Sequence, residues 1–83
     1  MFKLLKETAV ETKTNNHITI ETYKEDKGYF TVAFIVNETG SINPRNVLVY
    51  EKTEKECLAL ITHDFFCQKA SELSLDKDLH IIR

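Results

Sequence analysis

The stretch HITIETYKEDKGYFTVAFIV, residues 17–36, decides the fold of this 83-residue chain. Its first part alternates, with Ile18 and Ile20 on one side and polar or tyrosine side chains on the other, as in a half-buried β-strand. A polar stretch leads to Gly28, which can adopt the positive φ angle of a turn, and residues 29–36 are rich in β-branched and aromatic side chains. The pattern predicts a β-hairpin.

The second strand of this hairpin is apolar on both faces. One face carries Phe30, Val32, Phe34 and Val36, and the other carries Tyr29, Thr31, Ala33 and Ile35. A strand that is apolar on both sides is usually interior in its sheet, so we expect a neighbouring strand on each side of it.

The segments outside the hairpin supply the remaining elements. Residues 1–15 fit either a helical face or the alternation of a strand, and their threonine content favours a strand. Residues 47–50 and 79–82 are predicted as further strands. Thr53 and Glu56 have the spacing of a capping box, which predicts the start of a helix.

The predicted architecture is an α+β fold in a single domain, residues 1–83. It has a small, mainly antiparallel sheet of about four to five strands, with one helix, about residues 54–73, packed on one face.

Two apolar stripes run along the predicted helix. At about 100° per residue, one stripe contains Cys57, Leu58, Ile61 and Phe65, and it is the expected buried face. The other contains Ala59, Leu60, Phe66, Cys67 and Ala70, with His63 beside them. Because one sheet covers one stripe, either the N-terminal segment or a partner covers the second. In the partner hypothesis, Phe66 is the aromatic anchor, Leu60 its flank and His63 the polar component.

A loop of about ten residues, 37–46, is a second candidate contact surface, because long loops in small domains often carry binding residues. We expect Asn43 and Arg45 to contribute to it. Glu56 and Asp64 lie at the rim of the helical surface, where negative charge would complement a basic partner.

The charge balance argues against some partners and compartments. Eleven basic and thirteen acidic residues give a formal net charge of −2, without a basic block, so general nucleic-acid binding is disfavoured. No apolar run reaches the length of a signal peptide or a membrane span. We therefore expect a cytoplasmic protein with Cys57 and Cys67 reduced.

Catalytic and metal-binding patterns are weak. His63 and Cys67 are four residues apart on the predicted helix, the spacing of two ligands or of a thiol and its base. Cys57 projects away from both on ideal helix geometry, and no CxxC or HExxH pattern occurs. The chain is predicted not to be an enzyme, and neither a cofactor nor a metal site is expected.

Two other functions remain open. Tyr23, Tyr29 and Tyr50 lie on predicted strands, where tyrosines can stack on unpaired bases, so a single-stranded nucleic-acid-binding module is one alternative. A self-associating structural module, with the second helical stripe at a homodimer interface, is the other.

In its format the chain resembles the anti-CRISPR proteins, small inhibitors encoded by phages and mobile elements. The shared features are one acidic domain of under about 100 residues, an antiparallel sheet with one helix, and no catalytic motif. The resemblance covers the whole chain as shape and composition. It implies a non-enzymatic protein that occupies a surface of a larger protein or nucleoprotein complex, in the host cytoplasm if a phage encodes it. The resemblance assigns no role to an individual residue.

Overall fold

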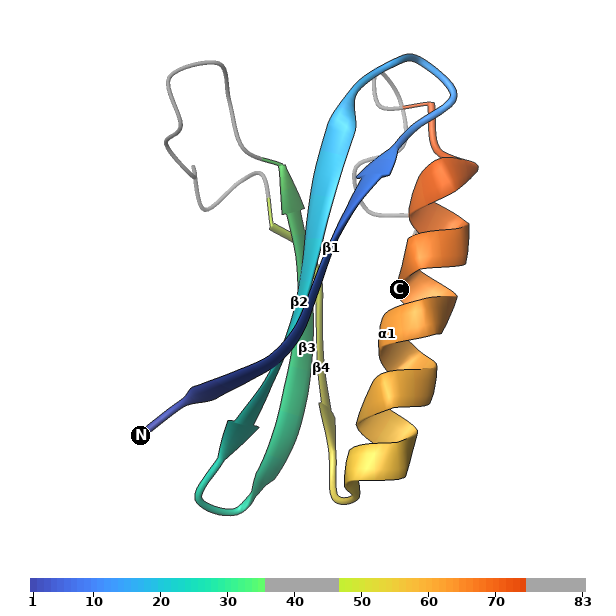
Figure 1. Cartoon of the computed structure of the whole chain (residues 1–83). Helices are drawn as coiled ribbons and strands as arrows, with labels where there is room; N and C mark the ends of the chain where they lie inside the picture. Colours follow the sequence, from blue (N-terminus) through green and yellow to red (C-terminus); the bar gives the residue numbers. More distant parts are fainter. Residues whose placement is uncertain (36–46, 75–83) are drawn as a thin grey trace.

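A β-hairpin forms the middle of the structure. The computed structural model describes residues 1–35 and 47–74. In it strand β2, His17–Glu25, pairs antiparallel with strand β3, Gly28–Ile35 (Figure 1). The predicted hairpin is therefore confirmed.

Two further strands flank the hairpin. Strand β1, Lys3–Glu11, pairs with β2, and strand β4, Val47–Thr53, pairs with β3, so the sheet has the order β1-β2-β3-β4 with antiparallel neighbours. The strand predicted in the N-terminal residues and the interior position of β3 are both confirmed. Helix α1, Glu56–Ser71, packs on one face of the sheet, as expected for this α+β fold (Figure 1).

The core lies between α1 and the face of the sheet that carries the isoleucines of β2. Ile18 and Ile20 are fully buried there, and Ala33 of β3 lies opposite Ile20. The buried cluster consists of Ile18, Ile20, Ala33, Phe66, Ala70 and Leu73. Alternation along β2 and β3 places the other side chains of these strands on the face away from α1.

The helix begins later than the capping box predicts. Lys55 is the N-cap residue, with extended backbone angles and no side-chain capping hydrogen bond. Thr53 instead ends β4, where it pairs with Tyr29, and its buried Oγ1 has no partner among the residues that the structure describes. The capping-box prediction is wrong because β4 continues through Thr53 and keeps that residue in the strand ladder.

Some predictions concern residues outside the described ranges. These are the loop 37–46, with Asn43 and Arg45, and the strand 79–82. Within the described ranges, no helix has both the length and the apolar content needed to cross a membrane.

Gly28 should not tolerate a side chain. Its φ is +149°, and a Cβ atom built on it would lie 2.9 Å from the backbone oxygen of Thr53. Gly28→Ala should therefore lower the free energy of unfolding by about 1 kcal/mol or more, seen as a lower urea midpoint in circular dichroism. Lys27→Ala, in the exposed part of the same turn, is the matched control and should barely move the midpoint. Equal midpoints for the two variants would contradict this turn geometry.

Candidate functional site

The helix packs on the sheet through the stripe that contains Phe66 and His63, the stripe for which the sequence allowed a partner as the cover. Phe66 is 1% exposed and His63 is fully buried, so neither is available as a surface anchor and that expectation is wrong. Ala59 and Ala70 are buried on the same stripe, and their small side chains let the helix lie close to the sheet. The N-terminal segment takes part in this cover as β1, at the edge of the sheet.

His63 can be buried because both of its ring nitrogens have hydroxyl partners. Nε2 lies 2.8 Å from Oγ1 of Thr8 on β1, and Nδ1 lies 2.8 Å from Oγ1 of Thr22 on β2. The Thr22 hydroxyl is in turn 2.8 Å from that of Thr31 on β3. A neutral imidazole donates at one nitrogen and accepts at the other, and this row of hydroxyls satisfies it in either direction. His63 thus joins the helix to three strands.

An ion pair lies beside this histidine. Lys6 Nζ on β1 is 3.0 Å from Asp64 Oδ1, and both side chains are largely exposed. Burial, and after it the charge of Lys6, lowers the pKa of His63, while Asp64 acts in the opposite direction. Asp64 is therefore already engaged with β1, although an exposed pair of this kind contributes little to stability.

The row Thr8, His63, Thr22 has the order of a nucleophile, a base and an orienting group. A catalytic base has to reach a substrate, whereas His63 is fully buried. Cys67, half-buried one turn further along α1, has a pKa raised chiefly by burial, which makes its thiol a poor nucleophile. These side chains hold the helix in place. Within residues 1–35 and 47–74, no three His, Cys, Asp or Glu side chains are grouped to hold a metal ion.

The other helical stripe points away from the sheet. Leu58, Ile61 and Phe65 are 46%, 64% and 48% exposed, so the prediction that this stripe is the buried face is wrong. Their spacing of i, i+3 and i+7 places them in one row along the helix. The Lys69 ammonium lies 5.6 Å from the centre of the Phe65 ring. We call these three apolar residues the outer row.

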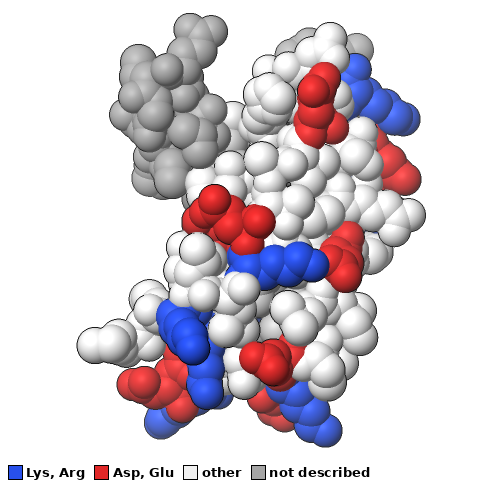
Figure 2. All heavy atoms as spheres, viewed as in Figure 1, with Lys and Arg blue, Asp and Glu red and all other residues white. Residues whose placement is uncertain are grey.

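The remaining predicted contact residues lie around this row or outside the described ranges. Leu60 is 36% exposed, and Glu56 and Asp64 are exposed. Asn43 and Arg45 fall within the range that the structure does not describe. Acidic and basic side chains are intermixed on the side of the molecule seen in Figure 2.

The three tyrosines do not share one surface. Tyr23 and Tyr50 both stack against Phe30 and so lie on the face of the sheet away from α1. Tyr29 pairs with Lys24 and Thr53, positions that alternate onto the helix side. The structure therefore brings together two of the three tyrosines proposed as a base-stacking platform.

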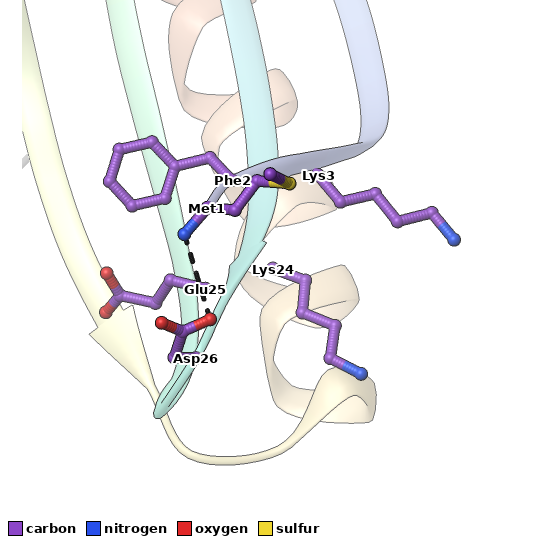
Figure 3. A pocket seen from close by; sticks show the side chains of 6 residues that line it. All are labelled: Met1, Phe2, Lys3, Lys24, Glu25 and Asp26. Carbon is purple, nitrogen blue, oxygen red and sulfur yellow. Dashed lines mark ion pairs between the residues drawn. The ribbon is translucent and has the colours of Figure 1, made fainter.

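A hollow of about 520 Å³ at the end of the sheet was not predicted from the sequence. It lies where the N-terminal residues pass the β2–β3 turn, and its lining is drawn in Figure 3: Met1, Phe2, Lys3, Lys24, Glu25 and Asp26. The amino group of Met1 is 3.7 Å from Asp26 Oδ1, and both groups are exposed to solvent. The Lys3 and Lys24 side chains extend away from this pair (Figure 3). The hollow is thus a shallow depression beside the solvated ion pair of Met1 and Asp26.

Comparisons with family models, curated proteins and solved structures found no significant match to this chain.

Proposed function

We propose that this protein is a non-enzymatic inhibitor that binds a larger protein or nucleoprotein complex through the outer row of α1 and occludes the surface beneath it. The observation that supports the proposal is the row itself. Leu58, Ile61 and Phe65 are each about half exposed or more, on a helix whose opposite face is already packed on the sheet. A continuous apolar row in water is typical of a surface that binds another molecule.

The charges beside the row suit a basic partner. Glu54, Glu56, Asp64 and Glu72 are exposed acids along α1 and its ends, against Lys55, Lys69 and the Lys6 of β1 that pairs with Asp64. Surplus negative charge at the rim of an apolar contact increases the rate of association with a positive surface more than it increases affinity. Positive surfaces are those with which proteins bind nucleic acid. Covering one of them would block that binding, as the likeness in format to anti-CRISPR proteins implies. A nucleic-acid-guided defence complex is therefore the first partner to test.

Ile61→Asp should abolish partner binding and leave the fold intact. Ile61 is 64% exposed, so the charge enters water rather than the core, and the free energy of unfolding should change by no more than about 1 kcal/mol. The measurement is affinity capture of the tagged protein from nuclease-treated lysate of the source organism or its host. Mass spectrometry of the eluate is followed by reconstitution with the purified partner. Circular dichroism checks the fold of the variant.

Ser71→Asp is the matched control, because Ser71 is exposed on the same helix but outside the outer row. It should bind the reconstituted partner as the unaltered chain does. Equal binding by Ile61→Asp would remove the outer row from the interface. If light scattering instead shows a dimer that Ile61→Asp converts to a monomer, the row is a self-association surface and the inhibitor proposal fails.

A further inference from the structure

The face of the sheet opposite α1 is a second surface, independent of the outer row. α1 covers one face of the sheet, and none of the other described elements packs on the opposite one (Figure 1). The pairing register assigns side chains from all four strands to this open face. They include Glu7 and Glu11 of β1, Glu21 and Tyr23 of β2, Phe30 of β3, and Tyr50 and Lys52 of β4.

Aromatic rings occupy one half of the open face. Phe30 is at their centre, with the ring of Tyr23 stacked at 5.1 Å on one side and that of Tyr50 stacked at 5.3 Å on the other. Phe2 approaches Phe30 edge-on at 5.2 Å. Phe30 is buried by its neighbours, whereas Phe2 and Tyr50 remain more than half exposed. The cluster therefore offers flat apolar surface to an incoming chain.

Glutamates lie on β1 and β2 of the open face, and Val32 and Phe34 of β3 lie on the same face. Glu7 and Glu21 are directly opposite each other across the β1–β2 ladder, and Glu11 follows on the same side of β1. The Tyr23 hydroxyl donates a hydrogen bond to Glu21 Oε1 at 3.0 Å. Burial, and then hydrogen bonding with the Glu7 carboxyl, raises the pKa of Glu21. When both groups are ionised, the two carboxylates repel each other, and a cation between them would relieve that repulsion.

The charge sum of the open face is strongly one-sided. The register places four glutamates on it, at positions 7, 11, 21 and 25, against one lysine, Lys52. Lys52 Nζ is 4.0 Å from Glu25 Oε1, so this lysine pairs with the glutamate nearest the aromatic rings. Among the strand residues that the structure describes, neither a lysine nor an arginine lies opposite Glu7, Glu11 or Glu21 on this face, and Glu11 lies opposite His17.

We propose that the open face is a second docking surface and that its occupant is a basic polypeptide segment. Lysine or arginine side chains of the segment face Glu7, Glu11 and Glu21, and its apolar side chains lie on the Tyr23, Phe30 and Tyr50 rings. Charge complementarity carries the choice of occupant. Phosphates of a nucleic acid would meet three carboxylates, and a second copy of this face would oppose acid to acid.

The test uses a defined peptide, so that it does not depend on finding the natural partner. The probe is a labelled twelve-residue peptide made of the repeat Arg-Arg-Leu-Leu, which presents both side chains on each face when extended, with a citrulline-for-arginine version as the uncharged control. Binding is measured by fluorescence anisotropy at fixed physiological salt, and the contact site is mapped by amide chemical shifts. Peptide shifts should concentrate on β1, β2 and the aromatic cluster, and the citrulline peptide should bind at least about tenfold more weakly.

Glu21→Gln separates this proposal from a purely structural role. The variant should bind the arginine peptide about tenfold more weakly, yet have a higher urea midpoint, because it removes a like-charge pair. Glu51→Gln is the matched control, with the same change in net charge on an exposed residue of β4 that the register places on the helix side. It should bind the peptide as the unaltered chain does.

Three results would overturn the proposal. The first is equal weakening by Glu21→Gln and Glu51→Gln, which would mean attraction by net charge alone. The second is tighter binding of a twelve-residue thymidine oligonucleotide than of the peptide, and the third is peptide shifts confined to α1. Ile61→Asp should bind the peptide normally, so failure of the outer row and failure of the open face are distinguishable.

Discussion

Phe66→Ala should destabilise the protein by about 3–5 kcal/mol, because it empties the centre of the core. Phe66 is 1% exposed and packs among Ile18, Ile20 and Ala33. A chain of this size has a total stability of only about 4–12 kcal/mol, so the variant should be largely unfolded or close to it. The measurement is urea denaturation followed by far-ultraviolet circular dichroism.

The adjacent residue provides an unusually close control. Phe65 carries the same side chain one position earlier, but it lies in the outer row and is 48% exposed. Phe65→Ala should shift the free energy of unfolding by about 1 kcal/mol or less. The reverse result, with Phe65→Ala the more damaging change, would mean that the helix is turned with the outer row towards the sheet.

Acidification should destabilise the fold through His63. Its pKa is lowered in the folded protein, chiefly by burial, whereas in the unfolded chain it returns to about 6.5. The unfolded state then binds the proton more readily, so stability is fully present above about pH 6.5 and is lost as pH falls through the folded value. The loss should reach up to about 1.4 kcal/mol for each pH unit between the two values.

Urea midpoints at several pH values between 7.5 and 5 test this expectation. His63→Gln should be less stable at pH 7.5 but should lack most of the slope, and His17→Gln, at an exposed position, should keep it. Glu21 acts in the opposite direction at lower pH, because its pKa is raised in the fold. The series is therefore repeated with Glu21→Gln as background. A slope that survives His63→Gln would assign the pH dependence to another group.

The sheet could be predicted from the sequence because side chains alternate between the two faces of a strand, which gives a pattern with a period of two residues. Ile18 and Ile20, the polar turn before Gly28 and the apolar run of β3 were enough to predict the hairpin and the interior strand. The threonines of residues 1–15 were enough to favour a strand there. In each case the decisive signal is local.

The rotation of the helix could not be predicted in the same way, because both stripes are apolar and hydrophobicity alone favours the wrong one. The outer row contains leucine and isoleucine, whereas the stripe that packs on the sheet contains Ala59, Ala70 and His63. Burial of His63 depends on Thr8 and Thr22, which lie 55 and 41 positions away in the chain. The available signal was the set of threonines on the helix side of the sheet, since buried hydroxyls need a polar partner from the helix.

Two of the three strand tyrosines, Tyr23 and Tyr50, could be predicted to belong to a binding surface, but the charge of the open face could not be predicted from the sequence. Opposition of Glu7 and Glu21 depends on the register between β1 and β2, which shifts at the irregularity between Leu4 and Lys6. A slip of β1 by one residue would send Glu7 and Glu11 to the helix side, away from Glu21.

The same irregularity in β1 bears on how the protein behaves when crowded with copies of itself. β1 is an edge strand of the sheet formed by the described residues, and an unbroken apolar edge is a template on which strands of other molecules assemble into fibrils. Here the ladder is broken near Leu4, and charged side chains recur along the strand at Lys3, Lys6, Glu7 and Glu11. Such breaks and charges hinder edge-to-edge growth. We therefore expect the edge at β1 to resist fibril growth even though apolar groups are exposed on the helix and the sheet.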